Sequence, residues 1–341
     1  MNGDSILVLA GALALGFAAA PASAGEVADF YAGKTITVVS AGSAGGAHGV
    51  YAQIISAHIK KHIPGTPTII IQFMPGAGGN KAMNYLFNAT RDDGSFLGVP
   101  LQDLIFGARI GVKAVKYNPA SAHYLGGADS TRTTVTVMKA SGIKTIDDAK
   151  RKEVLMAASG KSAQPYMIPV VLNEVLGTKF RVITGYNGLN GMHLAMDRGE
   201  VHGRASSWQS ITSTRKAWVR KGQIDNLLTI ALEREPQLPN VPALAEMVKD
   251  DDDKALIRLL AGTAAHGRAW IAYGGIPVDR LAALRRAYAD TMSDPAFMEE
   301  MKKRDLELRP VSWQEQEKLK QAMLATPEKT VARLKGILGL K

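Results

Sequence analysis

The sequence TITVVSAGSAGGAHG, Thr35 to Gly49, decides the fold, because a run of β-branched residues leads directly into a glycine-rich turn. Residues 50–63 follow and repeat apolar side chains on one helical face. The pattern returns at Thr68 to Gln72, TIIIQ, which precedes the turn MPGAGG and a predicted helix over 82–88. Strand, glycine turn and helix in this order are typical of a parallel β-sheet with helices on its faces.

The same alternation continues along the chain. The helix that reaches Leu176 is expected to end at Gly177, a natural left-handed stop. Beyond Pro277 the pattern is almost wholly helical. The sequence therefore predicts an α/β fold with two α/β segments and a helical tail, with later strands at 133–138, 154–158, 180–183 and 227–231 and a helix at 189–198.

The first 24 residues differ from the rest of the chain. One apolar run, Ile6 to Ala20, is followed by the small-residue triplet Ala22-Ser23-Ala24, which is the pattern of a cleaved signal peptide. The segment before the run carries Asp4 and no basic residue, which departs from the usual pattern. We expect residues 1–24 to be a signal peptide and the exported protein to begin at Gly25.

The composition narrows the classes of function. Cysteine is absent, which excludes disulfides, thiolate nucleophiles and cysteine-ligated metals. The net charge of +10 favours acidic partners, but the basic residues are scattered along predicted helices, which is typical of solvated helix faces rather than of a nucleic-acid surface. The seven histidines stand singly, without metal-ligand spacing. We expect no metal, no cofactor and no nucleic-acid partner.

Three glycine-rich loops follow predicted strands and open helices, at 42–49, 76–80 and 159–162. The N-terminus of a helix has unpaired N–H groups and a partial positive charge, and glycine lets an anion approach them closely. A tight turn that needs positive φ explains any one loop equally well. Several such loops at strand ends of an α/β fold favour an anion-binding site.

These loops complete no enzyme motif. Gly160-Lys161-Ser162 matches the end of a nucleotide-binding P-loop, but Leu155 stands where that motif needs a glycine. Ser43 in AGSAG has alanine where a nucleophile elbow has its first glycine, and the loop lacks G-x-G-x-x-G spacing. With no convincing nucleophile, base or metal cluster, the sequence predicts a binding protein and not an enzyme.

Together the motifs resemble the substrate-binding proteins of tripartite tricarboxylate transporters, also called the Bug family. The most specific element is the PGAGG turn after the second strand, paired with the GG turn after the first. The resemblance is collinear over nearly all of the chain after residue 24. It is carried by TVVSAGSAGGAHGVYAQ, HIPGTPTIIIQFMPGAGGNKAMNYL and DDGSFLG, and later by LGTKFRVITGYNGLNGMHLAMDRGEVHGR, QLPNVPAL and GIPVDRLAALRRAYADTMSDPAFMEE.

The resemblance implies a periplasmic binding protein of the type II-like, two-lobed class. Each lobe would be a mainly parallel sheet flanked by helices, with a ligand cleft between the lobes and crossing strands joining them. Lobe 1 would comprise residues 25–130 and 241–341, including the C-terminal helices, and lobe 2 residues 131–240. The ligand would be a small organic carboxylate (a dicarboxylate, a tricarboxylate or an aromatic acid), delivered to the membrane permease subunits of the transporter. A periplasmic ligand sensor that partners a membrane sensor, or an enzyme on the same fold, remains the alternative.

Members of this family hold one carboxylate mainly with backbone amides of the first glycine loop, and another group with the loop that corresponds to 159–162. Aromatic residues at predicted strand ends either stack on an aromatic acid or line the lobe interface. The candidate ligand-binding residues are the loop residues and their polar and aromatic neighbours: Ser43, Ala44, Gly45, Gly46, Ala47, His48, Gly78, Gly79, Asn80, Thr131, Ser159, Gly160, Lys161, Ser162, Tyr166, Asn187, Arg204, Ser207 and Trp208.

The chain departs from the family after the first strand, where many members have an aspartate and an arginine. Here Gly49 stands in place of the aspartate and Gln53 in place of the arginine. Loss of that carboxylate removes the obvious partner for a ligand ammonium group, which disfavours an amino-acid ligand. The alternative interpretation is that the aspartate and arginine of those members are only structural and hold the loop to the helix. Arg132, Lys161 and Arg204 near the strand ends of lobe 2, with no acid in the first or third loop, predict a preference for anions.

Overall fold

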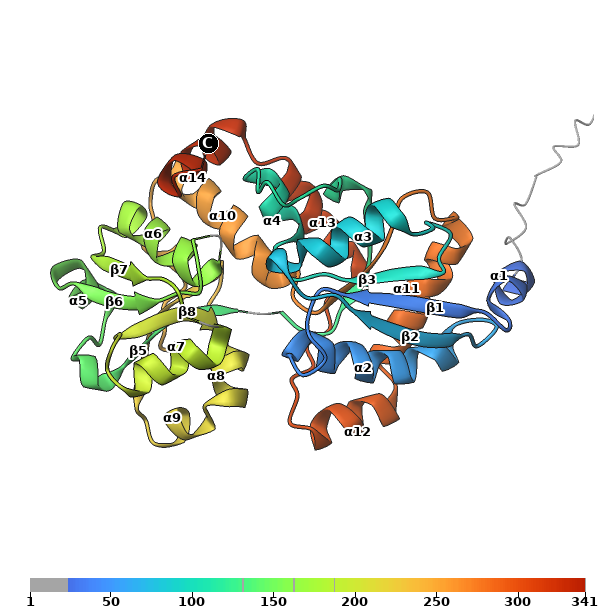
Figure 1. Ribbon diagram of the computed structural model, residues 1–341, viewed down its shortest axis with the longest axis horizontal. Coiled ribbons are helices and arrows are strands. Elements are labelled where there is room, and N and C mark those ends of the chain that lie inside the picture. Colours follow the sequence, from blue (N-terminus) through green and yellow to red (C-terminus); the bar gives the residue numbers. More distant parts are fainter. Residues whose placement is uncertain (1–23, 131, 162, 187, 341) are drawn as a thin grey trace, which may run out of the picture.

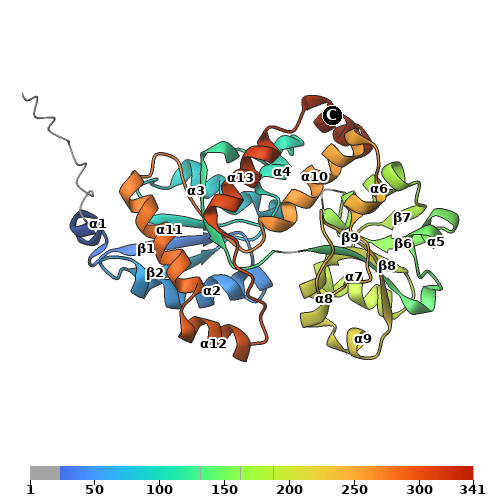
Figure 2. The ribbon, with the colours of Figure 1, turned by 180° about the vertical axis from the view of Figure 1, so that it is seen from behind.

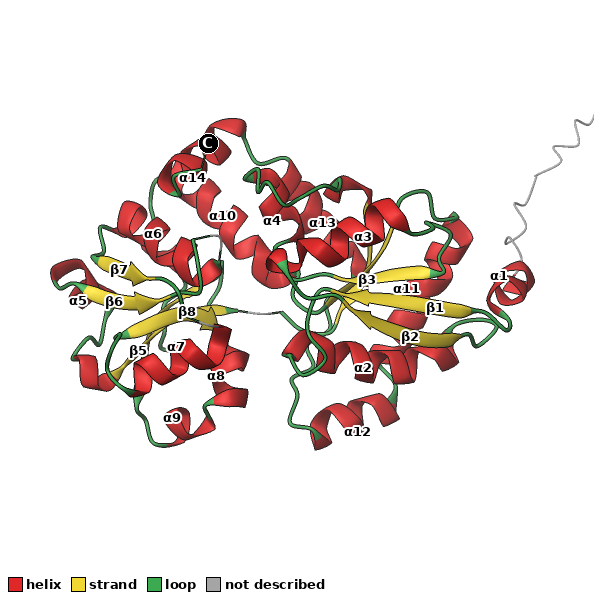
Figure 3. Cartoon of the chain, viewed as in Figure 1, coloured by secondary structure: helices red, strands yellow, loops and turns green. Residues whose placement is uncertain are grey.

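The computed structural model describes residues 24–130, 132–161, 163–186 and 188–340. Two β-sheets lie side by side, and helices cover both faces of each sheet (Figures 1 and 3). The predicted signal peptide falls almost wholly outside the described residues and stays a prediction. None of the described helices is both long and apolar enough to cross a membrane.

The first sheet has the strand order β2-β1-β3-β10-β4. Strands β1, β2 and β3 are parallel, and Ser40 pairs with both Phe73 and Val99, so the three strands end at one edge. Strand β10 runs antiparallel to its neighbours β3 and β4. The strands are β1 (Thr35–Ser40), β2 (Thr68–Phe73), β3 (Phe96–Val99), β4 (Ala122–Gly127) and β10 (Ala269–Tyr273).

The second sheet repeats this plan with the order β7-β6-β8-β5-β9. Strands β7, β6 and β8 are parallel, and β5 runs antiparallel to β8 and β9. In each sheet the antiparallel strand is therefore the one that the chain forms first after it leaves the other sheet. The strands are β5 (Thr133–Met138), β6 (Val154–Ala157), β7 (Phe180–Ile183), β8 (Gly203–Ser207) and β9 (Ile224–Ile230).

Helices pack on the two faces of the first sheet. One face carries α3 and α4, and the other carries α2, α11 and α12, with α13 against β4 (Figures 1 and 2). Apolar side chains of β1 point alternately into the two layers, since Val39 packs with the α3 side and Val38 with the α2 side. The helices are α1 (Ala24–Tyr31), α2 (Ala47–Ile59), α3 (Asn80–Ala89), α4 (Leu104–Arg109), α11 (Val278–Met292), α12 (Pro295–Lys303) and α13 (Trp313–Leu324).

The second sheet is covered by α5 (Ile146–Arg151), α6 (Gln164–Leu176), α7 (Gly188–Asp197), α8 (Trp208–Thr214) and α9 (Lys216–Arg220). The predicted α/β architecture, with two mainly parallel sheets, is confirmed. Helix α6 ends at Gly177, whose φ of 69° supplies the expected left-handed stop.

The chain crosses between the sheets twice, after β4 and after β9. The return crossing includes α10 (Asp251–Ala265), which runs between the two sheets in both ribbon views (Figures 1 and 2). The last helix, α14 (Glu328–Ile337), contacts both α10 and α6, and Arg333 pairs with Asp253 at 2.6 Å. One apolar core is continuous between the sheets on this side, from Phe106 to Ile168 and Leu260. The predicted lobe boundaries at 130/131 and 240/241 stay predictions.

Candidate ligand-binding site

The site is defined by the loops that leave the parallel strands. Because β1, β2 and β3 end in register, the loops at 41–46, 74–79 and 100–103 emerge from one edge of the first sheet. A Cβ on Gly79 would lie 3.2 Å from the Cβ of Ala41, so the first two loops touch. Open α/β sheets bind ligands at this edge.

The first loop presents free backbone amides. Gly46 is the N-cap of α2, and no side chain of the described chain caps that end of the helix. Ser43, Ala44 and Gly45 are exposed, and the turn is closed by a hydrogen bond from the Gly46 N–H to the Ser43 carbonyl, 3.0 Å. Unpaired N–H groups at the start of α2 are therefore open to an anion.

Gly49 and Gln53 fix this loop against α2. A Cβ on Gly49 would lie 2.1 Å from the carbonyl oxygen of Ser43, so no side chain fits there. The Gln53 Nε2 donates to the Ala44 carbonyl at 2.9 Å and to the Gly49 carbonyl at 3.1 Å. In this chain Gly49 and Gln53 therefore keep the loop close to the helix. This fits the interpretation in which the residues at these two positions have a structural role.

His48 faces the interior of the first lobe. Its ring Nδ1 lies 3.1 Å from Nη1 of Arg268, and burial together with this guanidinium holds the pKa of His48 well below its ordinary value. A neutral imidazole is thus expected at neutral pH. The side chain of His48 thus interacts with Arg268, while its backbone N–H lies in the first turn of α2, whose N-terminus has no side-chain cap among the described residues.

The second loop has four consecutive residues with positive φ. Gly76, Ala77, Gly78 and Gly79 have φ values of 132°, 48°, 64° and 88°. Glycine adopts this region without the steric cost that other residues meet, which explains the composition of the PGAGG turn. Asn80, the first residue of α3, braces the turn by donating its side-chain amide to the Ala77 carbonyl at 2.8 Å.

The third loop leads from β6 into α6. Ser159 and Lys161 are exposed, and the Ala163 N-cap of α6 has no side-chain cap within the described residues. No ion pair of Lys161 occurs in the described chain, so its ammonium group is available to an anion. Ser162, together with Thr131 and Asn187, lies outside the described residues, and these three predictions stay untested.

Asp103, which was not among the predicted site residues, connects the first lobe to the start of α6. It follows β3, and its Oδ1 accepts a hydrogen bond from Nε2 of Gln164, the first residue of α6, at 2.8 Å. Burial raises the pKa of Asp103 to about 6, while the bond from Gln164 acts in the opposite direction. The only signal for this residue was its place after a parallel strand, and the four-residue strand β3 was not predicted.

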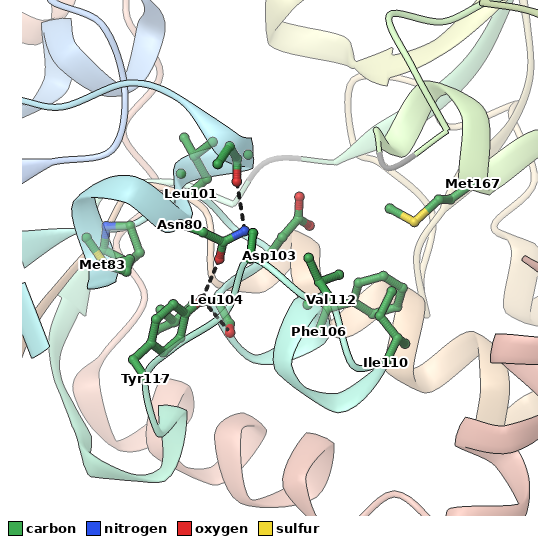
Figure 4. A pocket seen from close by; sticks show the side chains of 16 residues that line it. Asn80, Met83, Leu101, Asp103, Leu104, Phe106, Ile110, Val112, Tyr117 and Met167 are labelled. Carbon is green, nitrogen blue, oxygen red and sulfur yellow. Dashed lines mark hydrogen bonds between the residues drawn. The ribbon is translucent and has the colours of Figure 1, made fainter. Parts of the chain in front are cut away.

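A pocket of about 150 Å³ lies beside the second loop (Figure 4). Asn80, Asp103 and Tyr117 supply its polar side chains, and Met167 reaches it from α6 of the other sheet. The pocket is therefore lined mainly by the first half of the molecule, and one side chain of the second half reaches it. The other side chains that line it are apolar: Ala77, Met83, Pro100, Leu101, Leu104, Phe106, Ile110, Val112 and Ala114.

Other candidate residues lie away from this pocket. Trp208 is 7 % exposed, packs in the core between β6 and α7–α9, and donates its indole N–H to Gln237 at 2.7 Å. Ser207 caps α8 by accepting from the Ser210 N–H. Arg204 is 4 % exposed and faces His193, with 3.3 Å between Nη1 and Nε2. Little of the Trp208 ring is left to stack on a ligand, and Tyr166 is half-buried against the core.

The basic residues differ in what they can offer a ligand. Arg132 is tied to Glu235, with its Nε 3.3 Å from Oε2, and to the Arg234 carbonyl. Burial lowers the pKa of Arg204 to about 9. Lys161 is the exposed member of the three. Within the described chain no three histidine, aspartate or glutamate side chains gather as a metal site would require.

Two mixed sheets are linked by two crossings, and a pocket beside the second loop is lined from the first sheet and by Met167 of α6, an arrangement found in the two-lobed class of solute-binding proteins. The family model described as "Tripartite tricarboxylate transporter family receptor" matches residues 52–335, and the chain belongs to this family. The family and the fold are those of solute-binding proteins, as the resemblance in the sequence predicted.

Solved structures show the same fold at low sequence identity. A TctC solute-binding protein from Polaromonas has a TM-score of 0.67 and 17% identity, over 90% of this chain and 98% of that one. A protein of R. palustris with adipate has a TM-score of 0.64 and 17% identity, over 90% and 97% of the two chains. MatC from Rhodopseudomonas palustris, with bound malate, has a TM-score of 0.59 and 18% identity, over 90% and 98%. Comparison with curated proteins finds no match.

Proposed function

We propose that the protein binds a small organic carboxylate in the cleft between its lobes and delivers it to the membrane permease of a tripartite tricarboxylate transporter. The observation that carries the proposal is the first glycine loop, where the uncapped N-terminus of α2 meets exposed amides from Ser43 to Gly45. Preorganised N–H donors and the helix dipole favour a carboxylate at that place. Relatives with bound adipate and malate support this class of ligand.

The ligand would be held from both sides of the cleft. The amides of the first loop belong to one lobe, while Lys161 and the start of α6 belong to the other. A ligand that contacts both lobes stabilises the closed form over the open form, which is how binding drives closure. No chemical step is assigned to the ligand.

The proposal is tested by a thermal-shift screen of the protein without residues 1–24 against a panel of organic acids. A ligand at about 100 times its Kd stabilises a protein by about 2.7 kcal/mol, which is a readily measured rise in Tm. Calorimetry on the acids that raise Tm then gives the affinity. If no acid of the panel raises Tm and none binds by calorimetry, the proposed function is wrong.

The protein would be exported across the inner membrane, and its signal peptide would be removed after Ala24. The apolar run from Ile6 to Ala20 and the triplet that follows it support this. N-terminal sequencing of protein recovered from the periplasm should begin at Gly25. Recovery of the uncleaved chain from the cytoplasm alone would contradict it.

A further inference from the structure

We infer that the ligand is a monocarboxylate with an apolar body, an aromatic ring or a short alkyl chain, and that this body lies in the pocket next to the second glycine loop. Asp103, on the wall of that pocket, excludes acids that would place a second carboxylate there. The inference rests on the proposed function, because it assumes that the single carboxylate is held by the first loop.

The position of the pocket places it within reach of a ligand bound at the first loop. Gly78, Gly79 and Asn80 form part of its wall, and Gly79 packs against Ala41, where β1 passes into the first loop. On the opposite side Met167 comes from α6, whose N-terminus follows the third loop. A ligand whose head is held by the first loop therefore has the pocket beside it.

The side chains that line the pocket favour an apolar group over a charged group. No lysine, arginine or histidine belongs to the described side chains that line it. Tyr117 donates to Asn80 Oδ1 at 3.0 Å, and Asn80 donates to the Ala77 carbonyl, so these polar groups already bond to each other and to the chain. A second carboxylate in this place would lose its water without gaining a cation.

Asp103 further disfavours the binding of a second carboxylate in the pocket. One oxygen of its carboxylate is held by Gln164 at 2.8 Å, which fixes the group at the wall. Figure 4 shows it among Leu104, Phe106 and Val112. A ligand carboxylate in the same apolar space would meet a like charge in a region of low dielectric.

The volume sets the size of the ligand body. A volume of about 150 Å³ is close to that of an apolar protein cavity that takes up benzene. One aromatic ring or an alkyl chain of similar bulk fits such a space. A dicarboxylate of the same length would place its second carboxylate in the pocket.

The test compares acids of equal carbon skeleton by calorimetry on the protein without residues 1–24: hexanoate against adipate, and 4-methylbenzoate against terephthalate. We expect at least one monocarboxylate to bind at least about tenfold more tightly than its dicarboxylate counterpart, because the second charge is desolvated without a partner. Val112→Phe, which fills the pocket, should weaken that monocarboxylate by about tenfold or more and leave the melting temperature of the free protein near that of the wild type.

Asp103→Asn should raise the affinity for the dicarboxylate relative to that for the monocarboxylate by about fivefold or more, since the like charge is gone and the bond from Gln164 is kept. Asp103→Ser is the second variant if Asp103→Asn folds poorly. Asp290→Asn, at an exposed aspartate on α11, is the control and should change neither affinity.

Equal or tighter binding of the dicarboxylates by the wild-type protein would overturn the inference and leave the proposed function standing. The same holds if Asp103→Asn and Asp103→Ser leave the dicarboxylate affinity unchanged relative to that for the monocarboxylate, or if Val112→Phe leaves the monocarboxylate affinity unchanged in a folded protein. If none of the acids tested here or in the panel binds, the proposed function fails and the inference fails with it.

Discussion

Asp129 shows how a single residue at a lobe crossing makes stability depend on pH. It follows β4, is fully buried, and neither of its carboxylate oxygens accepts a hydrogen bond of good geometry within the described chain. Burial, followed by the negative charge of Glu307, raises the pKa of Asp129 to about 7, although Arg268 and Arg309 act in the opposite direction. An ionised carboxylate here opposes folding.

The first prediction follows from the direction of this shift. Between about pH 4 and pH 7 the folded protein holds a proton on Asp129 that the unfolded chain has lost, so Asp129 makes the free energy of unfolding fall as pH rises, by up to about 1.4 kcal/mol per pH unit. Asp129→Asn removes this dependence. The measurement is Tm against pH for both proteins, and their difference should grow in favour of the variant from pH 4 to pH 7. Parallel curves would show that Asp129 does not titrate in this window.

The second prediction concerns Gly45 in the first loop. A Cβ on Gly45 would meet nothing within 4 Å, whereas one on Gly46 would press on Ser43 Oγ at 3.0 Å. Gly45→Val should therefore leave Tm of the free protein nearly unchanged and weaken carboxylate binding by about tenfold or more, because the added side chain occupies ligand space. Gly336→Val in α14, also in open space, is the matched control. Calorimetry that gives equal affinity for Gly45→Val and the wild type would exclude this loop as the carboxylate site.

At the scale of elements, the first loop and α2 act as one unit. Gln53 is the side chain that joins them, through its two hydrogen bonds to the carbonyls of Ala44 and Gly49. A loop whose amides must keep a fixed direction binds less tightly when it is free to move, because the ordering cost then falls on the binding step. The packing of Gly49 and Gln53 against the loop fits the structural interpretation of this pair.

The third prediction is that Gln53→Ala weakens carboxylate binding by about threefold to tenfold while it lowers the free energy of unfolding by only about 1 kcal/mol, the usual contribution of a hydrogen bond. Gln53→Arg should not restore the affinity, since Gly49 supplies no carboxylate to pair with it. Calorimetry and urea unfolding measure the two quantities. An affinity loss no larger than that of an exposed control such as Asp290→Asn would count against the bracing role.

The sequence predicted those elements whose pattern is local. Strands β1, β2, β5 and β7 were placed to within a residue, and the stop at Gly177 was correct, because alternation and left-handed glycine are properties of short stretches. Strands β3, β4 and β10 were not predicted. FLGV is only four residues long, and AWIAY, buried on both faces, follows the helical pattern of α10 after a break at Arg268, whose φ is 53°.

The candidate ligand-binding residues stay predictions. The composition of the glycine loops indicated their backbone conformation, and the structure places the loops after β1 and β2 at one edge of the first sheet. Asp103 was not found, since it follows the unpredicted strand β3, and its bond to Gln164 joins residues 61 positions apart. Trp208 and Arg204 were expected near the ligand from their strand-end position, but the side chains of Arg204 on β8 and of Trp208 at the start of α8 are both buried. Burial depends on tertiary packing and leaves no local signal.

At the scale of the whole molecule, the contacts between the lobes differ from side to side. An apolar core continuous through α4, α10 and α6 joins them on one side. Polar contacts join them elsewhere: Gln209 donates to Glu307 at 3.0 Å, and Lys216 pairs with Asp305 at 2.5 Å. Lys216 and Asp305 are exposed, and an exposed ion pair contributes little to stability. We therefore expect the polar side to be the one that opens and closes.

The fourth prediction is that ligand binding makes the molecule more compact. Closure over a ligand held by both lobes lowers the radius of gyration, whereas binding to one lobe alone leaves it unchanged. Small-angle X-ray scattering, with and without a carboxylate found by the screen, measures this. Gly45→Val at the same ligand concentration should show no compaction. An unchanged radius of gyration in the saturated wild-type protein would contradict closure.

The central claim is that the cleft recognises a carboxylate through N–H donors at helix starts and does no chemistry on it. The most direct test is calorimetry of the best acid from the screen against its primary amide at neutral pH. Loss of a hydrogen bond to a charged group costs about 1.5 to 3 kcal/mol, so the acid should bind about tenfold to 150-fold more tightly, and it should be recovered unchanged. Equal affinities of acid and amide, or conversion of the acid, would contradict the account.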